Sequence, residues 1–452
     1  MSTTVWRNWS GTQTCRPERT LRPATEGAVA AAVAEAAAAG GVVRPLGAGH
    51  SFTPVACTEG VRLQLDGLSG LVAVDHAAGT VTLRAGTRLR DIPGLLRPLG
   101  LALPNQGDVD PQSVAGAVST GTHGTGAGFT GFAGTVRAFR IIGADGVARD
   151  CRPDAPGEAG ELFRLGRLGL GVFGVLTELT MTAVPAFHLL ADEHLEDFEA
   201  LRREFPARVR AADHLEFYWF PGTDAALVKD NRRIPDADLA AWAASPEAAG
   251  VTRPTRLGRV RGFIDEELIS NGALWAMCEL ARARPGLVPR LNALAARTVP
   301  RRRWVGPAHE VFVSPRRVRF AEMEYAVDLD DAPEVLAEIR RVIDAAGAHV
   351  SFPLEVRAAA ADDVALSTAY GRQSCYIAVH RYHREDHRDY FALVEPVLAA
   401  AGGRPHWGKL HTLGATELRE RYPLFDEVAR LRARLDPEGV FLNDHLRGLF
   451  GA

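Results

Sequence analysis

The stretch Arg44-Pro45-Leu46-Gly47-Ala48-Gly49-His50-Ser51-Phe52 begins as a short apolar strand and then turns at two glycines. Successive backbone N–H groups in such a turn form a concave nest for phosphate oxygens, and glycine lets the backbone approach a ligand closely. The turn is not the dinucleotide fingerprint GxGxxG, because Phe52 occupies the sixth position, and no GK[ST] follows to make it a Walker loop. A phosphate-bearing ligand at this turn therefore requires a different fold from either of these.

A second polar run, Gln112-Ser113-Val114-Ala115-Gly116-Ala117-Val118-Ser119-Thr120-Gly121-Thr122-His123-Gly124-Thr125-Gly126, lies some sixty residues further along the chain. Its four glycines, three threonines and two serines make it too polar for a core strand. A surface loop is the simple alternative, but the length of the run and its paired glycines favour ligand binding. We expect its backbone donors and hydroxyls to hold a diphosphate-bearing cofactor.

The composition places the chain among ordinary globular proteins of more than one domain. It has 452 residues, of which 46% are hydrophobic and 24% charged, and its net charge of −3 lacks the basic excess of a nucleic-acid-binding protein. The five cysteines form no CxxC pair, so we expect neither a metal site nor a dithiol motif and favour a reducing compartment. With no apolar leader and no stretch of ~20 apolar residues, we expect a cytoplasmic protein without a transmembrane segment. Peripheral contact with a membrane surface is left open.

The order of expected elements indicates an α+β fold with two domains. The first half shows short strands and few helices, with strands expected at 42–46, 61–65, 71–74, 80–84, 135–143 and 176–184, and helices at 27–39 and 91–99. The second half predicts an antiparallel sheet with helices on one face, from strands at 214–220, 318–327, 349–357 and 375–382 and helices at 332–346, 386–401 and 416–435. We place the domains at 1–186 and 187–452. Residues 232–310 are helical in places and carry no motif.

Together the two glycine-containing runs resemble the FAD-binding (PCMH-type) domain of the vanillyl-alcohol-oxidase superfamily, in its sugar-1,4-lactone oxidase branch. The run Leu103-Pro104-Asn105-Gln106-Gly107-Asp108-Val109-Asp110 is similar to the L-gulonolactone and D-arabinonolactone oxidoreductases, which are related to alditol oxidases. The segments MEYAV, PLEVR, TAYGR, RPHWGK and DPEGVFLND extend the resemblance through the C-terminal half. The resemblance implies an N-terminal FAD-binding domain and a substrate (cap) domain, with residues 404–452 returning to the flavin.

The resemblance also implies how FAD is held. The histidine of GHSF is joined to the flavin in this family, which makes His50 the expected covalent link; a neutral imidazole is a competent nucleophile near pH 7. No cysteine lies between Leu103 and Ser113, so we expect no second link. A histidine that merely caps the turn is the alternative. The expected cofactor-binding residues are Pro45, Leu46, Gly47, Ala48, Gly49, His50, Ser51, Asp108, Ser113, Gly116, Thr120, Thr122, His123, Gly124, Val175 and His406.

The expected catalytic residues are Glu355, Arg357 and Lys409. Glu355 and Arg357 are two apart on a strand and so share a face. By the resemblance Arg357 hydrogen-bonds the reacting oxygen, while Glu355 orients Arg357 and a substrate hydroxyl. Lys409 is one of only two lysines among 52 basic residues, the other being Lys229. We expect its charge beside the substrate oxygen and the reduced flavin, with His406 at the cofactor.

Several other residues are weaker candidates. Glu322 and Glu324 share a strand face, so that one of them lines the pocket, and His380 is a further pocket candidate. Asn443 either touches the flavin or caps the last helix. His123 is expected to be largely structural within its loop.

The resemblance implies FAD-dependent oxidation of an aldono-1,4-lactone at its C2 hydroxyl, by hydride transfer to flavin N5, giving an ascorbate-type product. The electron acceptor is O2 or another molecule, and the small Gly107 permits access of oxygen. The alternative enzyme is an alditol oxidase that acts on a terminal hydroxyl and yields an aldose and hydrogen peroxide; such enzymes tend to carry a short hydroxyl residue in place of Asp108. A flavin-binding protein without catalysis is a third possibility.

Overall fold

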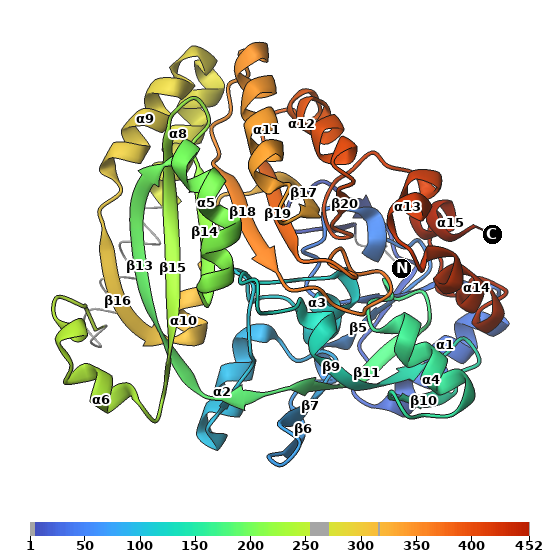
Figure 1. The fold of residues 1–452 in the computed structure, drawn as a ribbon. Helices are drawn as coiled ribbons and strands as arrows, with labels where there is room; N and C mark the ends of the chain where they lie inside the picture. Colours follow the sequence, from blue (N-terminus) through green and yellow to red (C-terminus); the bar gives the residue numbers. More distant parts are fainter. Residues whose placement is uncertain (1–4, 254–270, 315–316, 452) are drawn as a thin grey trace.

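The computed structural model describes residues 5–253, 271–314 and 317–451, and it confirms the α+β fold (Figure 1). The N-terminal half contains two small sheets. A parallel sheet of order β3-β5-β4 presents the glycine turn at the end of its edge strand, and a five-stranded antiparallel sheet of order β10-β9-β11-β7-β6 lies beside it. Their strands are β3 (Arg19–Leu21), β4 (Val43–Leu46), β5 (Val61–Gln64), β6 (Leu71–Asp75), β7 (Thr80–Arg84), β9 (Val136–Ile142), β10 (Ala148–Cys151) and β11 (Val175–Thr182).

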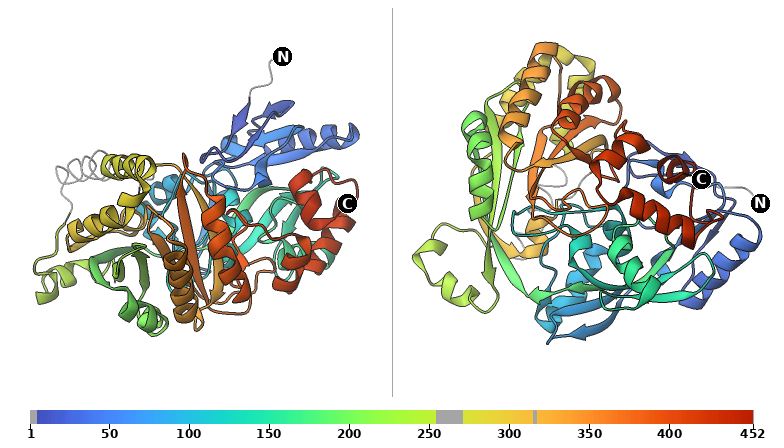
Figure 2. Two further views of the ribbon diagram at one scale, coloured as in Figure 1. Left: turned by 90° about the horizontal axis from the view of Figure 1, so that it is seen from above. Right: turned by 45° about the vertical axis from the view of Figure 1, so that its right-hand side comes forward.

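The second half forms one eight-stranded antiparallel sheet of order β16-β13-β15-β14-β18-β19-β17-β20. Its strands are β13 (Phe187–Asp197), β14 (His214–Trp219), β15 (Ala225–Pro235), β16 (Arg302–Pro307), β17 (Phe320–Asp328), β18 (Leu354–Ala359), β19 (Ser374–Tyr382) and β20 (Arg404–Pro405). The helices α5 (Phe198–Ala211), α11 (Ala332–Ala346) and α12 (Arg388–Ala400) cover one face of this sheet, as Figures 1 and 2 show.

Strand alternation divides the large sheet into an apolar face and a charged face. Phe217, Met323, Val356 and Val379 join the core beneath the three helices. Their chain neighbours point the other way because successive strand residues alternate. These neighbours are polar or charged although they are buried, and they are Glu216, Tyr218, Glu322, Glu324, Glu355, Arg357 and His380.

The remaining elements connect and cover the sheets. The helices are α1 (Glu26–Ala38), α2 (Ile92–Leu96), α3 (Val114–Thr120), α4 (Gly157–Gly166), α6 (Leu239–Ala243), α8 (Asn271–Ala283), α9 (Val288–Thr298), α10 (Ala308–Phe312), α13 (Ala415–Arg421), α14 (Phe425–Leu435) and α15 (Asp444–Phe450). The short strands are β1 (Trp6–Arg7), β2 (Thr14–Cys15), β8 (Leu101–Ala102) and β12 (Val184–Pro185). Of the motif-poor region 232–310, residues 254–270 lie outside the described residues.

The polar run at 112–126 contains the helix α3, which the Ser113 side chain caps by accepting from the Gly116 amide at 3.2 Å. Two expectations for local structure were wrong. The helix expected at 416–435 is two helices, since Pro423 disfavours helical backbone at the preceding Tyr422. The strand expected from residue 349 begins only at Leu354, after Pro353.

The C-terminal segment returns to the N-terminal half of the molecule. Helix α14 packs against α4 (Figure 1), and Phe425, Leu446 and Phe450 belong to the same apolar core as Val29 and Leu63. The domain boundary predicted after residue 186 falls between β12 and β13 and remains a prediction. All five cysteines are free. No helix in the described part of the chain is long and apolar enough to cross a membrane.

Candidate active site

Two adjoining cavities meet at His50, the first between the N-terminal half and the charged face of the large sheet, the second within the N-terminal half. The first, of about 790 Å³, is lined by Trp9, His50, Ser51, Phe52, Gly107, Asp108, Val109, Gln112, Thr120, Thr122, His123, Phe320, Glu322, Glu324, Glu355, Arg357, His380, His406, Gly408 and Lys409. The second, of about 750 Å³, is lined by residues of the turn 44–51, of α3 and its N-terminal flank, and of the segment 170–176. They share His50, Ser51, Gln112 and Thr120. The two adjoining cavities therefore suit a long ligand whose two ends differ in chemistry.

The glycine turn is built for close approach. Gly49 has a φ of 72°, a conformation that side chains other than glycine rarely adopt, and a Cβ there would lie 2.8 Å from the Trp6 ring. A Cβ on Gly47 would lie 2.5 Å from Ser113 Oγ. The turn and the start of α3 are thus held together with no space for a side chain between them, and both border the second cavity.

Gln112 stands where the two cavities meet. Its Nε2 donates to Thr122 Oγ1 at 3.1 Å, whereas its buried Oε1 has no hydrogen-bond partner among the described residues. A buried acceptor without a partner is costly unless a ligand supplies the donor. The open acceptor, the two-lobed cavity and the glycine turn fit a dinucleotide cofactor such as FAD. Sequence analysis did not select Gln112, although it begins the polar run.

His50 lies at the junction of the cavities and is fixed from two sides. Its ring stacks on Trp9 with centroids 5.4 Å apart. The chain that follows is tied to the C-terminal segment, because Phe52 N donates to Gly408 O at 2.7 Å and Thr53 Oγ1 donates to Trp407 O at 3.0 Å. Burial, and then the charges of Lys409 and Arg88, lower the His50 pKa to about 4. The imidazole is therefore neutral near pH 7.

Arg357 is surrounded by acidic groups at one side of the first cavity. It forms an ion pair with Glu355; its Nε lies 2.9 Å from Glu216 Oε2, and its Nη2 lies 3.4 Å from Asp108 Oδ2. Burial by itself would lower the Arg357 pKa, but these carboxylates raise it well above its usual range. The guanidinium is a fixed charge whose orientation is set by its neighbours. Glu216 was missed in the sequence because it lies about 140 residues away on β14.

Lys409 lines the same cavity. Its Nζ is 2.5 Å from Glu322 Oε2. The contact is set by backbone pairing, since His406 N donates to Glu324 O and Leu410 N to Glu322 O, both at 2.9 Å. Burial lowers the Lys409 pKa, but Glu322 and Glu324 outweigh it, so the pKa is raised. The ammonium therefore stays charged in its buried position.

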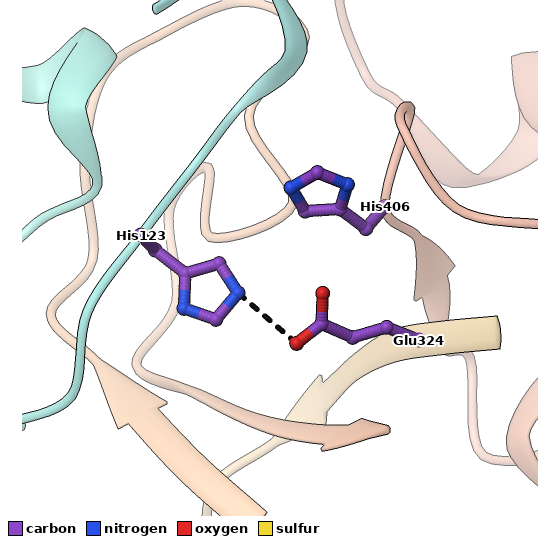
Figure 3. A group of neighbouring side chains, drawn as sticks. All are labelled: His123, Glu324 and His406. Atoms are coloured by element: carbon purple, nitrogen blue, oxygen red, sulfur yellow. Dashed lines mark ion pairs between the residues drawn. The ribbon is translucent and has the colours of Figure 1, made fainter. Parts of the chain in front are cut away.

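His123, Glu324 and His406 form a buried cluster at the base of the cavity (Figure 3). His123 Nδ1 donates to Gly124 O at 2.9 Å, and its Nε2 lies 3.2 Å from Glu324 Oε1. A carbonyl oxygen only accepts hydrogen bonds, so Nδ1 is the donor to Gly124, and Nε2 faces the Glu324 carboxylate. Burial raises the Glu324 pKa, but the charge and hydrogen bond of His123 and the charges of Lys409 and His406 together outweigh that effect and lower it.

The ligand atoms of these three residues lie within 4.8 Å of one another, which raises the question of a metal ion. His406 Nδ1 accepts from the Gly408 amide at 3.0 Å, so the neutral ring carries its proton on Nε2. Binding a metal at either ring nitrogen of His406 would break its hydrogen bond with the Gly408 amide, whereas His123 could bind a metal through Nε2 and keep its Nδ1 hydrogen bond. The cluster is a histidine–carboxylate pair, His123 and Glu324, beside the neutral imidazole of His406.

His380 has a different hydrogen-bonding pattern. Its Nδ1 donates to Pro353 O at 3.3 Å, which leaves Nε2 as an acceptor in the neutral ring. Nε2 lies 3.5 Å from Glu322 Oε1 and 3.8 Å from Glu355 Oε2, and the ring packs edge-on against Phe320. The nitrogen can take up a proton from within the cavity, and the two carboxylates would stabilise the resulting charge.

The structure brings nearly all the predicted site residues to the two cavities. Both Glu322 and Glu324 line the first cavity, where only one was expected. Two residues expected at the cofactor do not line either cavity. Val175 is fully buried in the core, and its neighbours Gly174 and Leu176 line the second cavity instead. Gly124 packs against Asn105 and Gln106, with no room for a Cβ.

Asn443 has the capping function that was one of its two expected functions. Its side chain accepts from Leu446 N at 3.0 Å at the start of α15. The same side chain donates to Pro54 O and Cys57 O at 2.9 and 2.7 Å. It thereby joins the last helix to the segment that follows the glycine turn.

Comparison with known protein families agrees with this architecture. The model of the D-arabinono-1,4-lactone oxidase family matches residues 179–449, and that of an FAD-binding domain matches residues 17–152. The chain belongs to the D-arabinono-1,4-lactone oxidase family. It is an FAD-dependent oxidoreductase of the aldonolactone-oxidising class, related to alditol oxidases.

Individual relatives within and near the family cover the whole chain. An L-gulono-1,4-lactone dehydrogenase of Mycobacterium tuberculosis is 38% identical over 99% of both chains. L-gulonolactone oxidase of Mus musculus is 28% identical over 98% of both, and an alditol oxidase of a Streptomyces species is 32% identical over 99% of both. Among solved structures, cholesterol oxidase from B. sterolicum matches with a TM-score of 0.79 and 18% identity, over 99% of this chain and 96% of the other. That structural likeness concerns the fold alone.

Proposed function

We propose that this protein oxidises an aldono-1,4-lactone at the C2 hydroxyl, with FAD attached covalently to His50. The main support is the cavity in which two permanently charged cations, Arg357 and Lys409, lie with the neutral His50. The family and the lactone-oxidising relatives support the substrate class.

The cavity is suited to a small polyhydroxy compound. Its walls carry the carboxylates of Asp108, Glu322 and Glu355, which can accept hydrogen bonds from sugar hydroxyls. Arg357 donates a hydrogen bond to the oxygen of the hydroxyl group that is oxidised, and Glu355 and Glu216 hold the guanidinium in place. Lys409 supplies a second positive charge. Charge placed in advance where negative charge develops commonly lowers a barrier by several kcal/mol.

The reaction removes a hydride and a proton from the carbinol. FAD, when bound, supplies the two-electron acceptor that takes the hydride. His380 Nε2 takes the hydroxyl proton, and Glu322 and Glu355 stabilise the imidazolium that forms. Loss of the hydride and the proton leaves a 2-keto lactone, which enolises to an ascorbate-type product. Either O2 or another acceptor would receive the two electrons, and the small Gly107 permits access of oxygen.

The second candidate function is oxidation of an alditol at its terminal hydroxyl, since an alditol oxidase is 32% identical. Asp108 favours the lactone, because its carboxylate lies 3.4 Å from Arg357, where polyol enzymes tend to carry a short hydroxyl residue. Anaerobic flavin reduction by L-gulono- and D-arabinono-1,4-lactone should be faster than by xylitol and sorbitol. Faster reduction by the polyols would favour the alternative. A flavin that none of these compounds reduces would contradict both.

The covalent link is tested separately. Flavin colour that stays in the washed, acid-precipitated protein, and that moves to the supernatant in His50→Ala, would support the link. If the colour of the natural protein moves to the supernatant, the proposed covalent bond between FAD and His50 is contradicted, but the proposed enzyme class is not.

A further inference from the structure

A row of alternating charges crosses the large sheet from its exposed edge to Arg357. Arg302 pairs with Glu193, Glu193 with Lys229, and Lys229 with Glu216 across successive strands. The next strand continues the row, since Phe217 pairs with Val356 and their neighbours Glu216 and Arg357 lie 2.9 Å apart. Residues directly opposite each other on neighbouring strands project to the same face. Arg302 is exposed, whereas Glu216 and Arg357 are buried.

Lys229 contacts both groups that support the Arg357–Glu355 pair. Its Nζ lies 3.8 Å from Glu216 Oε1 and 5.0 Å from the centre of the Tyr218 ring. The Tyr218 hydroxyl in turn lies 3.2 Å from Glu216 Oε1 and 3.1 Å from Glu355 Oε1. One lysine thus stands behind the carboxylate and the phenol that orient the catalytic cation.

The chain uses arginine at nearly every basic position, yet its two lysines both face acidic groups of this site. An arginine at 229 would present a wider, planar group to Glu216 and could compete with Arg357 for its two oxygens. A lysine offers a compact charge that balances Glu216 and leaves Oε2 to Arg357. The arrangement explains why a compact cation suits this position.

We propose that Lys229 is a positioning residue for the oxidation, acting through Glu216 and Tyr218 to hold Arg357 against the substrate oxygen. Lys229 does not line the cavity, so it acts without touching substrate or cofactor. This inference rests on the proposed function, in which Arg357 donates a hydrogen bond to the oxygen of the hydroxyl group that is oxidised. A small displacement of a group at the reacting centre can slow a reaction markedly, even when its cause lies outside the site.

The test compares Lys229→Met with Lys229→Arg and with Arg302→Met, a matched change at the exposed end of the same row. Stopped-flow reduction by L-gulono-1,4-lactone without oxygen should show a limiting rate about tenfold lower in Lys229→Met. Arg302→Met should equal the natural protein, and Lys229→Arg should recover only part of the rate, because its wider guanidinium competes with Arg357 for Glu216. Flavin content and thermal unfolding are measured for each variant, because a purely structural role would alter these and leave the limiting rate unchanged.

A second readout needs no turnover. Sulfite adds to oxidised flavin as an anion, and its affinity depends on positive charge held at the site. Lys229→Met should weaken sulfite binding about tenfold relative to Arg302→Met. If the natural flavin is reduced by no lactone or polyol, the proposed function fails and sulfite binding still tests the positioning of Arg357. If Lys229→Met matches Arg302→Met in sulfite binding, and in reduction rate where reduction occurs, the positioning role is overturned.

Discussion

Lys409 and Glu322 form an ion pair at 2.5 Å within the first cavity, although neither residue is near the other in the chain. Removal of the ammonium leaves Glu322 buried without its cation and removes a charge from the reacting centre. We expect Lys409→Met to lower the rate of anaerobic flavin reduction by ~10²-fold, and Lys409→Arg to lower it less. Stopped-flow absorbance at the flavin band measures both. An unchanged rate in Lys409→Met would show that the ammonium has no part in the oxidation.

The rate of flavin reduction should depend on Arg357 at least as strongly as on Lys409, because three carboxylates hold the planar guanidinium of Arg357. We expect Arg357→Met to lower the reduction rate by ~10²-fold or more, while Arg357→Lys restores little because an ammonium cannot reproduce the planar hydrogen bonds. The same rapid-reaction measurement applies, with flavin content as the control for folding. Recovery of the full rate by lysine would mean that charge alone is sufficient.

His50 gives a prediction for pH. Its pKa is lowered to about 4, chiefly by burial, so the nucleophilic neutral form predominates throughout the neutral range. Covalent incorporation of FAD into the apoprotein should therefore proceed equally fast at about pH 5.5 and about pH 8. Acid-precipitable flavin followed over time tests this, with His50→Ala as the blank. A rate that falls with a midpoint near the ordinary value of 6.5 would contradict the assigned environment.

The same shift affects stability, with a definite sign. Between pH 6.5 and 4 the unfolded chain binds a proton at His50 that the folded apoprotein does not. The free energy of unfolding contributed by this group therefore decreases as the pH falls through that window. Chemical denaturation of the apoprotein should show a weaker loss of stability over this window in His50→Gln than in the natural chain.

Gly107 gives a test of oxygen access. A Cβ there would lie 3.1 Å from His123 O and 3.5 Å from Thr122 Cγ2, so alanine fits with a small adjustment and narrows this wall of the cavity. We expect Gly107→Ala to leave flavin reduction within about threefold and to slow reoxidation by O2 about tenfold or more. Mixing the reduced protein with oxygenated buffer measures the second step. Equal reoxidation in both proteins would exclude this wall as the oxygen route.

Arg44 joins the two ends of the chain. The buried guanidinium donates to the carbonyls of Val55, Leu170, Gly171 and Phe441, the last at 2.6 Å. Arg44→Met should leave these carbonyls without their donor and reduce the free energy of unfolding by about 3 kcal/mol or more. Thermal unfolding measures the effect, and Arg62→Met, on the neighbouring strand, serves as a milder control. If the two variants lost equal free energy of unfolding, the hydrogen bonds of Arg44 would not have the stabilising role proposed for them.

Local sequence determined much of the molecule. The order of expected strands and helices indicated the α+β class, and the family resemblance carried by the glycines around His50, the polar run at 112–126 and the Glu355–Arg357 segment implied most residues of the two cavities. These features are short-range, because a tight turn needs glycine at a positive φ and strand neighbours two apart share a face.

Only the tertiary structure decided the partners of these residues. Glu216 and Asp108 reach Arg357 from distant strands and loops, and Lys409 meets Glu322 because its segment pairs along β17. The hydrogen bonds that fix Nδ1 of His123 and of His380 as donors come from the carbonyls of Gly124 and Pro353 in the surrounding backbone. Sequence spacing carries no information about such contacts, since they depend on strand order and register across the sheet. Residue types thus follow from the sequence, whereas charge states and orientations follow from the packing of segments that are remote in the chain.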